Sequence, residues 1–257
     1  MIPETPETYY CDACDSEVKG FHRFCHNCGE YLGSDATRIS LFNHSQLQSA
    51  FKFFIIYLFV CLVVHFTNWF DAYDRLFWVE IFLGSVTLFY VWINFNEIKP
   101  VLRFRNFSFV RLTGCISLAA IISVFVNIIV TKLNISFFGT DARCYGRYSI
   151  YTMPAMIMIY SIAVNPAIFE ELAFRGVIYN YLNSFLNERL VVIVTGFTFA
   201  IMHLNFISLF WLVPFGILVG AMRKRFGTIW YGVIFHFIFN FIAVLFDLYK
   251  QGQLWFQ

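Results

Sequence analysis

Long apolar runs fill the chain from Phe51 onward, whereas the residues before it are mostly polar. Such runs predict membrane-spanning helices, because a helix needs about 20 predominantly apolar residues to cross the hydrocarbon core of a bilayer. The runs lie at 53–70, 77–95, 111–131, 150–183, 190–204, 207–222 and 228–248. The sequence therefore predicts an all-α polytopic membrane protein with about seven transmembrane helices, within a range of six to eight.

The fourth run is too long for one straight span, and Pro154 and Pro166 interrupt it. A single long helix, tilted or kinked, and two shorter elements both fit this pattern. The fifth and sixth runs are short. The number of crossings therefore depends on how the residues at 150–183 fold.

The pattern divides the chain into a polar module at 1–33, a linker at 34–50 and a transmembrane domain at 51–257. The composition agrees, with 59% hydrophobic residues, 13% charged residues and a mean hydropathy of +0.66. A soluble globular protein carries about 25% charged residues, so that class is excluded. No cleavable signal peptide is visible before residue 50, and the first span is expected to serve as the insertion signal.

Basic residues predict the orientation of the spans, because Lys and Arg are enriched in cytoplasmic loops. One basic group lies between the second and third spans (Lys99, Arg103, Arg105 and Arg111), and another follows the sixth span at 223–225. Both are cytoplasmic if the fourth run is a single element. We therefore favour seven spans in an integral membrane protein, in the plasma membrane if the source is bacterial, with the N-terminus inside. The loop at 132–147, with Lys132, Arg143 and Arg147, argues mildly against this orientation.

Two cysteine pairs stand in the polar module. Cys11-x2-Cys14 is followed after ten residues by Cys25-x2-Cys28. Two such turns typically supply four thiolates to a tetrahedral Zn²⁺, and a segment of this size depends on the metal for its folding. A pair of disulfides or a redox CxxC is the alternative, and a cytoplasmic location argues against it. His22 and His26 are alternative ligands.

The module at 1–33 therefore resembles a zinc ribbon with a structural zinc. Modules of this kind stabilise a chain or bind other proteins, so a cytosolic partner is one expectation. No nucleic-acid partner is expected. The remaining cysteines (Cys61, Cys115 and Cys144) show no pairing pattern.

Two adjacent carboxylates, Glu170 and Glu171, interrupt the fourth apolar run. An ionised carboxylate in mid-membrane costs about 2.5–3.5 kcal/mol on insertion scales, so such residues usually face a polar interior and mark function. Arg175 lies four residues after Glu171 and can neutralise it on the same helix face. Glu170 points about 100° away. A helix end at the membrane interface is the structural alternative.

Three further polar residues lie in the later runs: His203, then His236 and Asn240 four residues apart. Each has a structural interpretation, because a single histidine or a buried polar pair can simply join helices. Their coincidence with the two carboxylates, in three separate spans, indicates a hydrolytic site inside the membrane.

Three short motifs carry a family resemblance. Glu170-Glu-Leu-Ala-Phe-Arg175 matches the EExxxR pattern, Phe199-Ala-Ile-Met-His203 matches FxxxH, and His236-Phe-Ile-Phe-Asn240 matches HxxxN. In this order the motifs resemble those of the CPBP intramembrane proteases, which process CAAX proteins and bacteriocins. The resemblance covers about 150–245, includes the Gly216-x3-Gly220 helix, and leaves out the ribbon and the first two spans.

The resemblance implies glutamate-dependent peptide hydrolysis. Glu170 would be the general base on a water that His203 helps to hold. His236 and Asn240 would donate hydrogen bonds to the oxyanion, where donors are most effective in a site poor in water. Glu171 with Arg175 would support them, although Glu171 could share the role of base.

Other functions stay open. The glutamate and the two histidines could bind a catalytic Zn²⁺, as in a metalloprotease, although the amide of Asn240 suits an oxyanion better than a metal. The chain could instead be a non-enzymatic scaffold or an immunity-type protein, or, with less support, a transporter. The expected surroundings are the lipid bilayer and a membrane-associated peptide or protein substrate.

Overall fold

The structure is a computed structural model that describes residues 8–19, 22, 24–32, 44–104, 107–140 and 144–252. It contains two compact units, Met1–Gln48 and Ser49–Gln257, and each is described by itself. Most of the predicted linker, at 34–43, lies outside the described residues, and so do Arg105 and Arg143 of the basic loops.

The first unit is a small β module built around the cysteines. Strands β1 (Thr8–Tyr10) and β2 (Glu17–Lys19) pair in antiparallel register, with Tyr9 opposite Val18. The first cysteine pair forms the turn between these strands. An isolated bridge between Phe24 and Tyr31 closes the second turn in the same way. The cysteine turns and short antiparallel pairings agree with the zinc-ribbon prediction.

The second unit is helical. Its longer helices are α1 (Ser45–Phe66), α2 (Tyr73–Ile93), α4 (Phe109–Phe138), α9 (Glu188–Ile201), α10 (Leu209–Phe226) and α11 (Trp230–Lys250). The short elements are η2 (Asn68–Phe70), α3 (Phe95–Leu102) and α5 (Tyr145–Tyr148). Between α5 and α9, one rod is built from α6 (Pro154–Ile159), η3 (Tyr160–Val164), α7 (Asn165–Glu171), η4 (Leu172–Ile178) and α8 (Tyr179–Asn183).

Five helices of the described residues are long and apolar enough to cross a membrane: α1, α2, α4, the rod at Pro154–Asn183 and α11. The membrane class is therefore confirmed. Of the other two predicted spans, α9 has 14 residues, and α10 ends in three basic residues. The total of seven crossings and the orientation stay predictions.

The fourth apolar run folds as one rod, as the favoured topology requires. The helix begins at Pro154 instead of 150, because proline suits the first helical turn, where its missing N–H has no partner to lose. Two stretches of the rod, η3 and η4, are π-helical. The first directly precedes α7, whose first turn contains Pro166. Proline cannot donate to the carbonyl four residues before it, so the helix widens there.

Two predicted loops are wrong in part. The segment after α2 forms the helix α3 before the chain leaves it at Arg103. Helix α4 continues past 131 to Phe138 and ends at Gly139, whose φ of 69° suits a left-handed cap. Lys132 therefore lies on a helix rather than in a loop. Polar residues at these positions are compatible with helix as well as with a loop, so hydropathy alone did not locate the helix ends.

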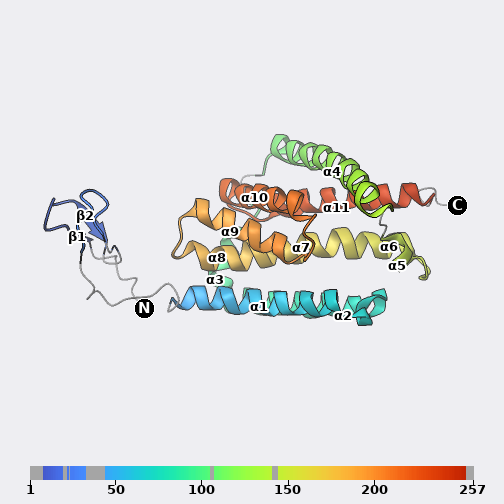
Figure 1. Cartoon of the computed structure of the whole chain (residues 1–257), viewed down its shortest axis with the longest axis horizontal. Coiled ribbons are helices and arrows are strands. Elements are labelled where there is room, and N and C mark those ends of the chain that lie inside the picture. The colour runs from blue at the N-terminus through green and yellow to red at the C-terminus, as the bar shows by residue number, and fades with distance from the viewer. Residues whose placement is uncertain are drawn as a thin grey trace. The chain divides into compact units, whose positions relative to one another are not determined.

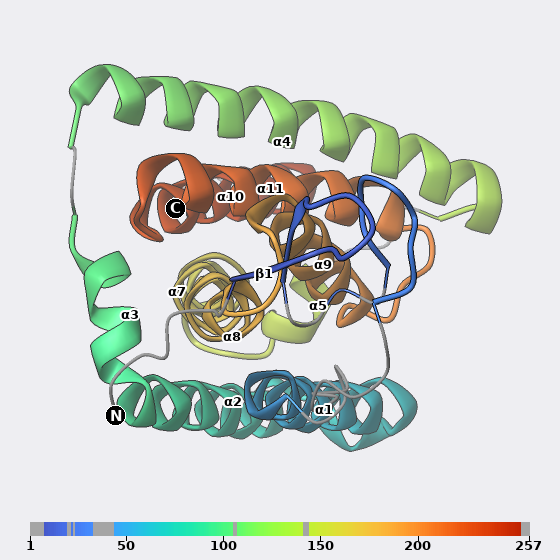
Figure 2. The same cartoon turned by 90° about the vertical axis from the view of Figure 1, so that its left-hand side faces the viewer.

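Within the second unit, the rod and the last helices form the centre. Figure 2 shows α4 along one side and α1 with α2 along the opposite side, with α7, α8, α9, α10 and α11 between them. In Figure 1, α10 and α11 lie between α4 and the rod. Helix α11 contacts both η3 and α7, and α9 packs closely on α10. This arrangement brings the three predicted motifs together at the centre.

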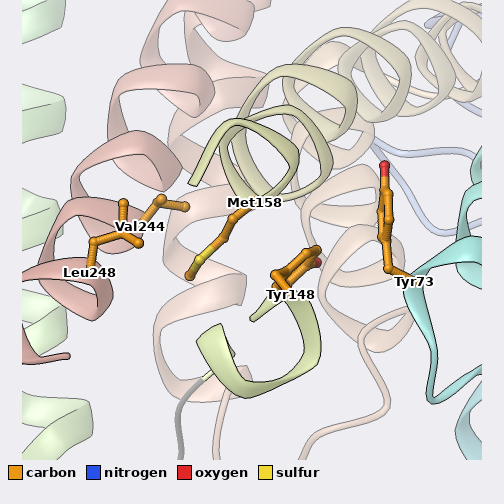
Figure 3. Packing of buried hydrophobic residues seen from close by; sticks show 5 residues of the cluster. All are labelled: Tyr73, Tyr148, Met158, Val244 and Leu248. Atoms are coloured by element: carbon orange, nitrogen blue, oxygen red, sulfur yellow. The ribbon is translucent and has the colours of Figure 1, made fainter. Parts of the chain in front are cut away.

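Part of the apolar packing lies near the ends of α2 and α11. Figure 3 shows its five buried residues: Tyr73, Tyr148, Met158, Val244 and Leu248. They come from α2, α5, α6 and α11. The cluster therefore ties the first part of the rod to α2 on one side and to α11 on the other.

Candidate active site and metal centre

Glu171 and Arg175 form a buried ion pair at the centre of the second unit. Arg175 Nη1 donates to Glu171 Oε1 at 3.1 Å, and both side chains are 0% exposed. Arg175 Nη2 also donates to the Gly216 carbonyl of α10 at 2.8 Å, and its guanidinium lies 4.7 Å from the centre of the Phe199 ring. The predicted partnership is present, and it joins the rod to α9 and α10.

His236 extends this pair. Its Nδ1 lies 3.0 Å from Glu171 Oε1, and its side chain is 4% exposed. A carboxylate oxygen only accepts, so Nδ1 carries the hydrogen and donates it. The opposite nitrogen, Nε2, is therefore left to accept a hydrogen bond, or to donate one once it is protonated. Glu171 thus orients the imidazole.

Glu170 lies beyond the other edge of the same ring. His236 Nε2 is 3.9 Å from Glu170 Oε2, and the Glu170 side chain is 30% exposed. Within the described residues, Glu170 Oε2 is buried and makes no hydrogen bond. The two adjacent carboxylates therefore differ in exposure and pairing: Glu171 is enclosed and its Oε1 contacts Arg175 and His236, while the Glu170 side chain is partly exposed.

Asn240 has a structural partner that the sequence did not suggest. Its Nδ2 donates to the Ile162 carbonyl in η3 at 2.8 Å. Ile162 stands four residues before Pro166, so its carbonyl lacks the usual helical donor. One N–H of the Asn240 amide thus satisfies this carbonyl, and the second remains for a ligand. Only this second N–H could therefore donate to an oxyanion, which is the role predicted for Asn240.

His203 lies further from the carboxylates. Its Nδ1 is 3.0 Å from the Phe199 carbonyl of its own helix, so Nδ1 carries the hydrogen and Nε2 is the acceptor. The Phe199 ring lies 5.0 Å from the His203 ring and 5.8 Å from the His236 ring. Among the described contacts, none joins His203 directly to Glu170 or His236.

Glycines allow the helices to approach this closely. A Cβ on Gly196 would lie 2.8 Å from the Ile217 backbone nitrogen, and a Cβ on Gly216 would lie 2.7 Å from the Gly196 carbonyl oxygen. A Cβ on Gly232 would lie 3.0 Å from Glu171 Oε2. Any side chain at these positions would push α10 from α9, or α11 from the Glu171 carboxylate.

One partly buried polar residue of this unit, Glu80, lies outside the three motifs and was not predicted as a site residue. Glu80 of α2 accepts a hydrogen bond from Ser161 Oγ of η3 at 2.5 Å. Tyr148 donates to the same hydroxyl at 3.2 Å. Glu80 stands alone in the second apolar run, and a carboxylate inside a span is the signal that drew attention to Glu170. That rule, applied to every run, would have found it.

The four cysteines of the first unit converge. Their sulfur atoms all lie within 4.8 Å of one another, with Cys11 Sγ 3.7 Å from Cys28 Sγ and Cys14 Sγ 3.5 Å from Cys25 Sγ. Tetrahedral Zn²⁺ with Zn–S bonds of about 2.3 Å places sulfur atoms about 3.8 Å apart. The cysteines therefore fit a metal such as zinc.

Local geometry supports this assignment. The residue after each cysteine pair is in the left-handed region: Asp15 has a φ of 56° and Gly29 a φ of 76°. Each donates its backbone N–H to the first cysteine carbonyl of its turn, at 2.8 and 2.9 Å respectively. A hydrogen bond between Cys14 Sγ and Ser16 Oγ lowers the pKa of the Cys14 thiol to about 6, toward the thiolate that binds metal.

In the described residues, these cysteines are also the one group of three or more His, Cys, Asp or Glu side chains that converges closely enough for an ion. Around His236, the two carboxylates face opposite ring nitrogens instead of a common point. The alternative ligands His22 and His26 do not join the cysteine group and lie with ring centres 6.0 Å apart.

Comparison with known proteins agrees with the three motifs. Residues 152–242 match the model of a family described as Type II CAAX prenyl endopeptidase Rce1-like. The matched segment contains all five predicted catalytic residues and lies within the predicted core at 150–245. No curated protein and no solved structure matches the chain. Residues 152–242 of the second unit are therefore similar to the Rce1-like type II CAAX prenyl endopeptidase domain.

Proposed function

We propose that the chain is an intramembrane endopeptidase in which Glu170 activates a water molecule to hydrolyse a peptide bond of a membrane-associated substrate. The family match supports the peptidase activity. The proposed mechanism is supported by the arrangement around His236, where one carboxylate is buried and neutralised by Arg175 while its neighbour is 30% exposed.

The distance between Glu170 and His236 suits a shared water. Oε2 and Nε2 are 3.9 Å apart, which is too long for a direct hydrogen bond. A water placed about 2.8 Å from each atom would make an angle of about 90° between them. Such a water would bridge the unpaired Glu170 oxygen and the oriented imidazole.

In the proposed reaction, Glu170 takes a proton from this water as the oxygen attacks the substrate carbonyl carbon. The carbonyl oxygen becomes an oxyanion. Asn240 donates its second N–H to it, and His236 donates from Nε2 when that nitrogen is protonated. The C–N bond then breaks, and the leaving amine takes the proton held by Glu170. Glu171 and Arg175 hold the imidazole in place throughout.

His203 would complete the site as an acceptor. Its free Nε2 can accept from the water or from the substrate, but the Phe199 ring separates it from His236 in this structure. Side-chain rotation or substrate binding would have to shorten this gap for His203 to take the role implied by the resemblance.

The test is cleavage of a membrane-peptide library by the purified protein, analysed by mass spectrometry. Glu170→Gln keeps the shape but removes the base, and we expect it to lose cleavage by at least about a hundredfold. Glu188→Gln is the matched control, because Glu188 is 54% exposed and pairs with Lys224 at the surface. Equal cleavage by wild type and Glu170→Gln would refute the mechanism.

A Cys11→Ser/Cys14→Ser variant treated with a strong chelator separates the two metal questions. This variant removes the ribbon site, so any remaining metal dependence belongs to the membrane unit. Cleavage that survives chelation supports the glutamate mechanism. Cleavage that the chelator abolishes would move a catalytic metal into the membrane site. Absence of cleavage in wild type as well would favour a non-enzymatic scaffold.

A further inference from the structure

A cavity of about 270 Å³ lies beside the proposed site. It is formed by α1, α2 and the residues that follow α9. Its lining is Val60, Cys61, Val64, His65, Leu76, Val79, Glu80, Leu83, Met202, His203 and Leu204. The walls are mostly apolar, as in pockets that bind small groups. Two helices outside the family match thus supply most of the lining.

Two polar groups of this cavity are held as acceptors. Glu80 brings a carboxylate, and His203 brings Nε2, since its Nδ1 donates to the Phe199 carbonyl. Of the described residues that line the cavity, none is Lys or Arg, although a second histidine, His65, also lines it. A ligand that donates hydrogen bonds or carries positive charge would complement these groups, whereas a carboxylate would be repelled.

The Glu80 carboxylate is held in place. Its Oε1 accepts from Ser161 Oγ at 2.5 Å, and that hydroxyl also accepts from Tyr148. In the described part of the chain, Oε2 is buried and makes no hydrogen bond, although the carboxylate also interacts with the Asn165 side chain. The Glu80 side chain, which lines the cavity, is therefore held in one position.

The cavity adjoins the catalytic groups. His203 is common to both, and Cys61 on the cavity wall lies close enough to Glu170 to experience its charge. Helix α2 reaches the rod beside these residues, where a Cβ on Gly84 would lie 3.2 Å from the Phe169 ring. A group seated in the cavity would therefore be next to a peptide bond held at Glu170.

We propose that this cavity is a substrate subsite that selects a cationic side chain, such as that of lysine or arginine, and that Glu80 is its specificity-determining residue. The volume is far above the roughly 10–15 Å³ that one water requires. It is slightly below the roughly 300–1,000 Å³ of pockets for small molecules, so it suits one side chain. Calling the ligand a substrate group rests on the proposed function, but the charge preference of the cavity does not.

Cys61 allows the preference to be tested without any substrate. The full-length protein is treated with one of two small thiol reagents, the cationic aminoethyl methanethiosulfonate or the anionic sulfonatoethyl methanethiosulfonate. Peptide mass spectrometry then measures the rate of labelling at each cysteine. Cys144, which is exposed and does not line the cavity, corrects for the intrinsic reactivity of the reagents. We expect the cationic reagent to label Cys61 at least about tenfold faster, after this correction.

Two variants separate the contributions of the carboxylates. Glu80→Gln retains an oxygen for Ser161 but removes the charge, and it should lower the preference at least about threefold. Glu170→Gln should retain part of the preference for the cationic reagent. A preference no greater than that at Cys144 overturns the proposal. A preference that disappears in Glu170→Gln alone overturns it as well, because Glu80 would then contribute nothing. If Glu80→Gln does not fold, labelling of the wild type and of Glu170→Gln still tests whether the cavity prefers a cation.

A cleavage experiment tests the substrate role. Library peptides that carry lysine, norleucine or glutamate at each position near the scissile bond are compared in wild type and Glu80→Gln. We expect the wild type to cleave peptides with lysine faster than peptides with glutamate at one position. Glu80→Gln should lose this preference but still cleave the norleucine peptides. Equal selectivity in both proteins refutes the specificity role. If no peptide is cleaved, the proposed function fails, while the labelling still decides the charge preference.

Discussion

Arg175 offers the sharpest test of the energetics of the site. Its guanidinium is fully buried, donates to Glu171 and to the Gly216 carbonyl, and lies over the Phe199 ring. Arg175→Met keeps much of the side-chain length and removes the charge. Glu171 is 0% exposed, so its carboxylate would be left in a low-dielectric interior without the guanidinium.

Breaking a buried ion pair by removing one partner typically costs about 3–5 kcal/mol, because the remaining charge loses its compensation. We expect Arg175→Met to lower the free energy of unfolding by this amount. Arg175→Met/Glu171→Gln removes both charges and should recover at least about 1 kcal/mol of that loss. The rest would reflect the Gly216 carbonyl, which loses its donor in both proteins.

The assay is unfolding in mixed micelles with increasing SDS, followed by tryptophan fluorescence. Arg189→Met is the control, because Arg189 is exposed on α9 and should change stability by less than about 0.5 kcal/mol. A loss of less than about 1 kcal/mol of unfolding free energy in Arg175→Met would refute the compensation of Glu171 by Arg175. A double variant no more stable than Arg175→Met would refute it as well, because the ion pair would then not be the source of the loss.

Three further predictions concern a close helix contact, a buried hydrogen bond and a left-handed turn. Gly196→Ala should destabilise the second unit by about 1–3 kcal/mol in the same SDS assay, because its Cβ would lie 2.8 Å from a backbone atom. Gly220→Ala is the control and should cost far less, because the nearest contact of its Cβ would be a side-chain carbon at 3.4 Å. Asn240→Leu should lower stability by about 1–3 kcal/mol, because it leaves the Ile162 carbonyl unpaired. The cost should be smaller in a Pro166→Ala background, where the backbone N–H of residue 166 can replace the lost donor. Equal costs in both backgrounds would contradict this explanation. Gly29→Ala should weaken metal retention against a competing chelator, because a φ of 76° costs alanine about 1–2 kcal/mol; unchanged retention would show that the turn relaxes.

The sequence predicted the features that depend on composition and short spacing. The apolar runs gave the membrane class, and the spacing of Cys11, Cys14, Cys25 and Cys28 indicated a cluster that the structure contains. The four-residue interval between Glu171 and Arg175 predicted their ion pair, because residues at that interval share a helix face. In each case, the interacting residues are close in sequence or belong to a well-known local pattern.

Contacts between distant segments were not predictable in the same way. The carbonyl that Asn240 satisfies lies 78 residues earlier, and the Gly216 carbonyl that Arg175 reaches lies 41 residues later. Backbone carbonyls have no sequence signature, so such partners emerge only from packing. Pro166 did carry a clue, because a proline inside an apolar run leaves a carbonyl without its donor.

The two neighbouring glutamates show how environment separates identical side chains. Both follow Phe169 in one helix, yet Glu171 contacts Arg175 and His236 Nδ1, while Glu170 faces the Nε2 edge of the same imidazole and remains 30% exposed. A base must reach water and substrate, whereas a residue that orients an imidazole is most effective where its own position is fixed. If the two glutamates exchanged environments, the base would be enclosed and the residue that orients His236 would be partly exposed. The adjacency of the glutamates therefore serves a division of labour, in which the helix rotation of about 100° per residue directs one carboxylate to each side of His236.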